Sequence, residues 1–158
     1  MGFIERIENN QKIKAWKGNI PVEFVYTTGT AGEKFFRALR DSGKILGSTC
    51  KKCRTTYVPA RLFCERCMDE LTEFTDVGRV GTLIVFTTVN MDARGKHLAE
   101  PRILGLVQFE NAAGGVLHYI KSNDNGNIRI GAKVEAVFEP KESRKGLITD
   151  IKHFRMLD

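Results

Sequence analysis

The sequence predicts a mainly β protein: an N-terminal helical segment, then a four-cysteine zinc ribbon, then a five-stranded barrel of the OB type. Three observations carry this prediction: a T-x-x-E motif before an amphipathic stretch, two Cys-x-x-Cys pairs, and a β-rich remainder divided by turn residues. The 158 residues have room for one ordinary domain or two small ones. We therefore expect a helical and extended segment at 1–43, a ribbon at 44–72 and an OB-fold domain at 73–158.

The composition excludes two broad classes of protein. With 42% apolar and 28% charged residues, the chain resembles neither a disordered tail nor a membrane protein. Its longest apolar run, Leu83–Phe86, is far shorter than the ~20 residues that a membrane-spanning helix needs. The sequence opens without a charged and apolar leader, so we expect a soluble cytoplasmic protein with no membrane partner.

The first predicted element is a helix from Ala31 to about Asp41. Thr30 and Glu33 form a capping box, in which the Thr30 hydroxyl accepts from the Glu33 backbone N–H and the Glu33 side chain reaches back. Gly43 stands where the end of a helix favours a residue with positive φ. One face of the helix carries its apolar residues, Ala31, Phe35, Ala38 and Leu39.

The cysteines predict a structural metal site. Cys50 and Cys53 form one pair, Cys64 and Cys67 a second, and ten residues separate the pairs. A two-residue gap lets both thiolates of a pair face one tetrahedral ion, and four thiolates leave no open coordination position. Zinc is favoured, with iron possible, because the spacing does not distinguish the two metals. Two disulfides are one alternative, but an intracellular chain would keep these thiols reduced. A thioredoxin-like redox motif is the other, but neither pair lies in the βαβ unit that such a motif needs.

The chain beyond Glu73 predicts five short strands, separated by segments with turn chemistry. Five strands in this length, with a longer link before the fourth, suit a small Greek-key barrel of the OB type, and half of a β-sandwich is the competing fold. The predicted strands are Gly78–Val89, Ile103–Glu110, Val116–Lys121, Lys133–Glu139 and Leu147–Phe154.

The order of elements and the local text resemble a known family, the acyl-CoA-associated OB-fold proteins with an N-terminal rubredoxin-like zinc ribbon. The resemblance runs from about residue 20 to residue 154 and departs from the family pattern at Ala60 and Glu65, away from the cysteines. The matching text is Ala31–Phe36, Tyr57–Arg61, Gly81–Leu83, Thr88–Val89, Pro101–Val107, Gly114–His118, Gly131 and Val134.

The resemblance implies an accessory protein of acyl-CoA metabolism. Archaeal members of the family look like non-catalytic scaffolds that join an acetoacetyl-CoA thiolase to a hydroxymethylglutaryl-CoA synthase. A thiolase-type partner and a bound acyl-CoA are therefore expected. A scaffold should expose apolar side chains, and the N-terminal candidates are Ile4, Ile7, Trp16, Phe24 and Tyr26.

No catalytic constellation is visible in the sequence. The metal uses the four cysteines, and we expect His97 to lie in a solvated loop over Asn90–Pro101, His118 within a strand and His153 at the surface. No glycine-rich phosphate loop follows a strand and opens a helix, which argues against nucleotide hydrolysis. We therefore expect no enzymatic activity from this chain alone.

A basic window from Lys44 to Arg66 is the candidate anion-binding region, with six basic residues against one acid. A solvated basic surface is the simpler interpretation. The ligand-binding candidates are Lys51, Lys52, Arg54, Arg61 and, near the barrel mouth, His118. Single-stranded nucleic acid is the alternative ligand, because OB barrels stack bases on aromatic side chains; here these would come from Phe86, Phe109, Tyr119 and Phe138, which are otherwise barrel core.

Overall fold

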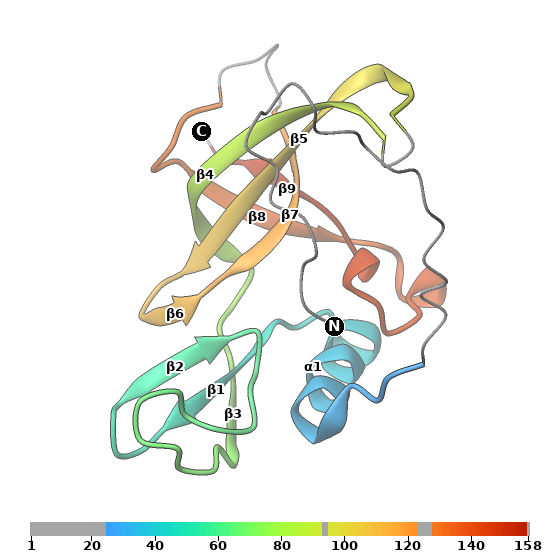
Figure 1. The fold of residues 1–158 in the computed structure, drawn as a ribbon. Helices are drawn as coiled ribbons and strands as arrows, with labels where there is room; N and C mark the ends of the chain where they lie inside the picture. Colours follow the sequence, from blue (N-terminus) through green and yellow to red (C-terminus); the bar gives the residue numbers. More distant parts are fainter. Residues whose placement is uncertain (1–24, 93–94, 123–127, 158) are drawn as a thin grey trace, which may run out of the picture.

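The computed structural model describes residues 25–92, 95–122 and 128–157. Ile4, Ile7, Trp16 and Phe24 lie outside these ranges. Two β structures and one helix make up the fold (Figure 1). The elements are α1 (Gly29–Ser42), β1 (Leu46–Cys50), β2 (Thr55–Val58), β3 (Glu73–Asp76), β4 (Val80–Met91), β5 (His97–Phe109), β6 (Ala112–Gly114), β7 (Val116–Lys121), β8 (Lys133–Phe138) and β9 (Ile151–Met156), with 3-10 turns η2 (Lys141–Ser143) and η3 (Ile148–Asp150) before β9.

The predicted helix is confirmed, but its capping box is wrong. Gly29, with a φ of 66°, turns the chain into α1 ahead of Thr30, so Thr28 is the N-cap and makes no side-chain capping bond. The Thr30 hydroxyl therefore lies within the first turn rather than before it. The buried face contains Ala31, Phe35 and Leu39 as predicted, with Ala38 half-buried. Gly43 ends the helix in the left-handed region, also as predicted.

The cysteine-bearing part of the chain is a small antiparallel sheet, which we call the ribbon: β1, β2, β3 and the loops that join them. Strand β1 lies between β2 and β3, with Ser48 opposite Tyr57 on one side and Phe74 on the other. Its core is small and holds Cys50, Tyr57, Cys64 and Leu71. In Figure 1 the ribbon lies below the other strands, with α1 beside it.

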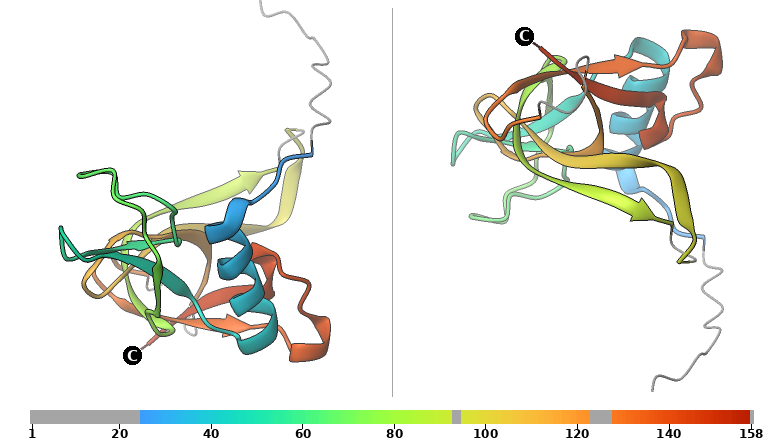
Figure 2. Two further views of the ribbon diagram at one scale, coloured as in Figure 1. Left: turned by 90° about the horizontal axis from the view of Figure 1, so that it is seen from below. Right: turned by 90° about the horizontal axis from the view of Figure 1, so that it is seen from above.

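The predicted five-stranded barrel is confirmed. Strands β4, β5, β7, β9 and β8 close in that order, and β7 and β9 are the parallel neighbours. We call these five strands the barrel; the view from above shows them curving around a common interior, with α1 to one side (Figure 2). Val107, Phe109, Val134 and Phe154 are among the fully or nearly fully buried residues of a core that extends to Phe35 and Leu39 of α1.

Two predicted strand boundaries are wrong. The expected loop over Asn90–Pro101 is a β-hairpin, because the Asp92 N–H donates to the Lys96 carbonyl and β5 begins at His97, opposite Met91. The last strand begins at Ile151 rather than Leu147. The carboxylate of buried Asp150 accepts from the backbone N–H groups of Lys145, Gly146 and Leu147, and this holds the preceding residues in turns.

A third β element connects the ribbon to the barrel. Strand β6, in the loop between β5 and β7, pairs in parallel with β2 and extends the ribbon sheet to the order β3-β1-β2-β6. Gly114 ends this pairing opposite Val58 with a φ of 83°, and a Cβ atom there would overlap the Val58 carbonyl oxygen. This glycine therefore lets the loop between the barrel strands β5 and β7 join the ribbon sheet through β6.

Candidate functional site

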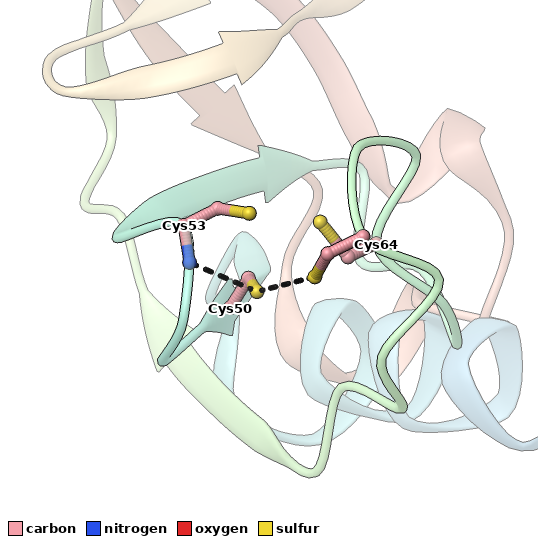
Figure 3. Close-up of side chains that lie close together, drawn as sticks. Cys50, Cys53 and Cys64 are labelled. Atoms are coloured by element: carbon pink, nitrogen blue, oxygen red, sulfur yellow. Dashed lines mark hydrogen bonds between the residues drawn. The ribbon is translucent and has the colours of Figure 1, made fainter.

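The four cysteines come together at one end of the ribbon (Figure 3). Cys50 ends β1, Cys53 lies in the loop before β2, and Cys64 and Cys67 lie in the loop before β3. Their four sulfur atoms all lie within 4.8 Å of one another, and the Cys50 and Cys67 sulfurs are 3.6 Å apart. A tetrahedron with zinc–sulfur bonds of about 2.3 Å has edges of about 3.8 Å. The donor set therefore fits one structural metal ion.

Local backbone geometry aims the thiols at a common centre. The Cys53 N–H donates to the Cys50 sulfur across 3.4 Å, and the Met68 N–H donates to the Cys64 carbonyl across 2.9 Å. Each turn needs a residue with positive φ immediately after its second cysteine. Arg54 (φ 53°) and Met68 (φ 58°) fill these positions, where glycine would be relaxed. Both loops are thus held in conformations that side chains other than glycine rarely adopt.

Tyr57 is the polar neighbour of the cluster that sequence reasoning did not single out as part of the site. Its ring is fully buried, and its hydroxyl oxygen lies 3.4 Å from the Cys64 sulfur. Hydrogen bonding from the Tyr57 hydroxyl lowers the pKa of Cys64 to about 6. The same bond raises the pKa of Tyr57 to about 12, and hydrogen bonding with Cys67 is the main cause that raises the pKa of Cys53 to about 12. The environment therefore favours the thiolate at Cys64.

The predicted basic window is largely neutralised by the fold. Lys51 lies 2.8 Å from Glu73, Lys52 2.7 Å from Asp69 and Arg61 2.6 Å from Glu65. Two of these acids follow the window in sequence, so a count confined to the window overstates its charge. Within the residues that the structure describes, Arg54 has no carboxylate within 4.0 Å. The four basic candidates are all exposed.

His118 differs from the four basic candidates of the ribbon because its side chain is buried. It is 7% exposed in the barrel, where its Nδ1 accepts from the Tyr119 N–H and its Nε2 lies 3.3 Å from the Ile148 carbonyl oxygen. These contacts fit the neutral ring protonated on Nε2. Burial lowers the pKa of His118, which favours the same neutral form. The structure thus gives this side chain two internal hydrogen-bonding partners.

The remaining aromatic and histidine candidates differ in how deeply their side chains are buried. Phe109 is buried, and Phe86 and Phe138 are half-buried against the barrel core, whereas Tyr119 is exposed. A row of stacking rings is therefore not formed by these four side chains. His97 is exposed on β5 and His153 is half-buried on β9.

Sequence reasoning missed an apolar outer face on the barrel. Val85, Leu106 and Leu117 lie opposite one another on the adjacent strands β4, β5 and β7, and Val85 and Leu117 are 50% and 59% exposed. Tyr119 follows Leu117 on the same side of β7 and is also exposed. The missed signal lies in β7, whose outward positions carry Leu117 and Tyr119 although its inward positions already supply the core. We call Val85, Leu106, Leu117 and Tyr119 the outer face.

Two family models match successive parts of the chain. One, described as the ChsH2 rubredoxin-like zinc ribbon domain, matches residues 37–72, and the other, the ChsH2 C-terminal OB-fold domain, matches residues 74–139. A curated relative, a DUF35 domain-containing scaffold protein of Methanocaldococcus jannaschii, is 27% identical over 120 residues, which cover 72% of this chain and 82% of the relative.

Solved structures agree with this assignment. A DUF35-family protein of unknown function from Sulfolobus solfataricus is 31% identical, covering 81% of this chain and 84% of its own, with a TM-score of 0.61. The Ltp2–ChsH2(DUF35) aldolase is 15% identical, with a TM-score of 0.59 over 78% of this chain and 91% of the matched chain, so it supports the fold alone. The predicted resemblance is confirmed, and this chain belongs to the DUF35 family of zinc-ribbon and OB-fold proteins.

Proposed function

We propose that this protein is a non-catalytic accessory subunit that docks an enzyme of acyl-CoA metabolism, of the thiolase or aldolase type, through the outer face of its barrel. The observation that carries the proposal is the apolar row Val85–Leu106–Leu117 across three adjacent strands. Contiguous apolar side chains on a protein surface are candidate sites of interaction with another protein. The partner surface on this face is therefore apolar.

The relative described as a scaffold supports the accessory role, and the class of partner is our proposal. The Methanocaldococcus jannaschii relative is described as a scaffold protein, and the ChsH2 structure is that of an aldolase assembled from Ltp2 and ChsH2. A thiolase joined to a hydroxymethylglutaryl-CoA synthase-type enzyme is the specific assembly we propose. Acyl-CoA itself would bind at the partner's site, with the exposed Arg54 as the ribbon residue most available to its phosphates.

The metal in this proposal is a structural zinc ion held by Cys50, Cys53, Cys64 and Cys67. Four thiolates fill a tetrahedral shell, so the ion supplies stability to the ribbon and offers no position for a substrate. Tyr57 would stabilise the shell through its hydrogen bond to Cys64. The ribbon then acts as a rigid platform attached to the barrel through β6.

Affinity capture tests the proposal. The tagged chain, bound to its native lysate and washed, should retain a thiolase or aldolase-type enzyme identifiable by mass spectrometry. The double variant Val85→Glu/Leu117→Glu should lose that enzyme, because two buried charges in an apolar interface weaken binding by about a hundredfold or more.

Ile130→Glu provides the matched control. Ile130 is an exposed apolar residue outside the outer face, so this variant should retain the partner as the wild type does. Recovery of nucleic acid without such an enzyme, equal loss from all variants, or thioester turnover by the purified chain alone would each overturn the proposal.

A further inference from the structure

The four thiols of the cluster differ in their access to solvent. Cys50 and Cys64 are buried, Cys53 is half-buried and Cys67 is exposed. Arg66 and Met68, the chain neighbours of Cys67, are exposed as well. An oxidant in solution therefore reaches the cluster at the Cys67 sulfur.

Oxidation of a cysteine depends on whether its sulfur is a thiolate and on whether that sulfur is accessible. A metal-bound cysteine is a thiolate, so all four members of a loaded cluster meet the first condition. Of the four, Cys67 is the exposed one. The Cys64 sulfur, in contrast, is fully buried and lies 3.4 Å from the Tyr57 hydroxyl oxygen. Cys67 therefore combines thiolate character with access to solvent.

A second thiol lies close enough to Cys67 to complete a disulfide. The Cys50 sulfur is 3.6 Å from the Cys67 sulfur, and Cys50 ends β1 whereas Cys67 lies in the loop before β3. A disulfide bond is about 2.05 Å long, so the two sulfurs would have to approach by about 1.5 Å. The loop that carries Cys67 lies at the surface, where Glu65, Arg66 and Met68 are exposed, so it can supply this movement without disturbing a packed core.

Loss of two thiolates would remove the support of the ribbon. A disulfide between Cys50 and Cys67 leaves Cys53 and Cys64, which are two ligands where a closed tetrahedral site needs four. The free energy of metal binding is folding free energy in such small units. The ribbon would therefore loosen, whereas the barrel has a separate apolar core.

We propose that Cys67 is a site of oxidation by hydroperoxides, and that the resulting disulfide with Cys50 releases the metal and unfolds the ribbon. The inference rests on the structural zinc of the proposed function and not on the docking of a partner enzyme. Cys67 is the thiol that meets the oxidant, and Cys50 is the thiol that resolves the oxidised sulfur.

The reaction consumes one hydroperoxide for each disulfide. With hydrogen peroxide, the Cys67 thiolate attacks one oxygen, so that an S–O bond forms, the O–O bond breaks and hydroxide leaves. The Cys50 thiolate then attacks the Cys67 sulfur, so that the S–S bond forms, the S–O bond breaks and a second hydroxide leaves. The two sulfurs together lose two electrons, and the peroxide gains them.

Titration of the purified, zinc-loaded chain with hydrogen peroxide tests the site. Its zinc content is measured first, and released zinc is then followed with a chromogenic chelator too weak to remove zinc from the untreated chain. We expect about one zinc ion released per disulfide formed. Peptide mapping without reduction should find the disulfide between Cys50 and Cys67. Hydrogen exchange should lose protection in β1, β2 and β3 while β7 and β8 keep theirs.

Cys67→His is the test variant, because histidine keeps a metal ligand at the exposed position but removes the nucleophilic sulfur. Peroxide should release its zinc at least about tenfold more slowly than from the wild type. Met68→Leu is the matched control, since it removes the neighbouring exposed sulfur, which cannot form a disulfide. This control should release zinc within about twofold of the wild-type rate.

Disulfide mapping in the wild type gives its answer whether or not Cys67→His takes up zinc. A wild-type chain that keeps its zinc in peroxide, a disulfide between two other cysteines, or zinc release prevented by Met68→Leu would overturn this inference alone. A purified chain that binds no zinc would overturn it together with the metal assignment of the proposed function.

Discussion

The ribbon and the barrel are both β structures, yet different interactions stabilise them. Sixteen buried residues form a core that is centred on the barrel and α1 and also includes Val58 of β2, whereas the ribbon's own buried core consists of Cys50, Tyr57, Cys64 and Leu71. Two of these four are members of the thiol cluster. Such a small cluster does not offset the conformational entropy of ordering three strands and two loops. Metal binding must therefore supply most of the ribbon's folding free energy, while apolar burial supplies that of the barrel.

This difference indicates a structural role for the ribbon and a binding role for the barrel. The ribbon directs its chemical groups inward to a closed cluster and pairs its basic side chains with acids on its own surface. The barrel buries the apolar side chains of its core and also exposes apolar and basic side chains on its outer surface. The partner enzyme is therefore expected at the barrel, with the ribbon as the supporting element. Among the described residues, no helix has the length and apolar character needed to cross a membrane.

Removal of the metal is the largest perturbation of this comparison. A strong chelator should abolish hydrogen-exchange protection in the ribbon, because structural zinc contributes about 10–16 kcal/mol to the folding of such units. The amides of β7 and β8 should keep theirs. Simultaneous loss in both regions, or protection retained in both, would contradict the division.

Leu83→Ala is the converse experiment and serves as its control. Leu83 is fully buried in the barrel core, and its truncation should lower the free energy of unfolding by about 2–5 kcal/mol. The metal content per folded molecule should stay constant, since Leu83 does not belong to the core cluster that contains the buried cysteines.

Gly114→Ala sharpens the comparison at the point where the two regions meet. The added methyl group would overlap the Val58 carbonyl oxygen at a φ of 83°, so we expect a loss of about 2–3 kcal/mol, with exchange protection reduced first between β2 and β6. Thermal unfolding and hydrogen exchange measure the two effects.

Gly131→Ala separates backbone strain from overlap. Gly131 has a similar φ of 87°, but no atom of the described residues lies within 4 Å of the added Cβ, so this variant should lose only about 1 kcal/mol. Equal losses in both variants would show that β6 does not couple ribbon and barrel.

Titration of His118 produces the smallest effect, and it acts on the barrel. Because burial lowers the pKa of His118 below its ordinary value of 6.5, the unfolded chain takes up a proton more readily than the folded chain as the pH falls. The contribution of His118 to stability should be constant above about pH 6.5, decrease below it by at most about 1.4 kcal/mol per pH unit, and level off below the folded pKa.

The neutral variant His118→Gln should reduce this pH dependence in urea unfolding curves, leaving the smaller part that comes from His153, whose pKa is also lowered by burial. An unchanged slope in the variant would show that His118 does not titrate between the folded and unfolded states.

The sequence predicted those features that depend on residues close together in the chain. The two-residue spacing of the thiols, the strand at Val116–Lys121 and the left-handed glycine at Gly43 each depend on residues close together in the chain, and the structure has all three as predicted. The start of α1 was wrong because Gly29 turns the chain before Thr30 can act as a cap. The start of β9 was wrong because the bonds to buried Asp150 form only when the turn is folded.

Tertiary structure alone decided what the surfaces present. The ion pairs Lys51–Glu73 and Lys52–Asp69 join residues 22 and 17 positions apart, and they turn an apparently basic window into a balanced surface. The grouping of Val85 with Leu117, and of Arg102 with Lys121, depends on strand register across the barrel. Charge and apolar area act over distances in space rather than along the chain, so only the folded register determines which of these side chains act together.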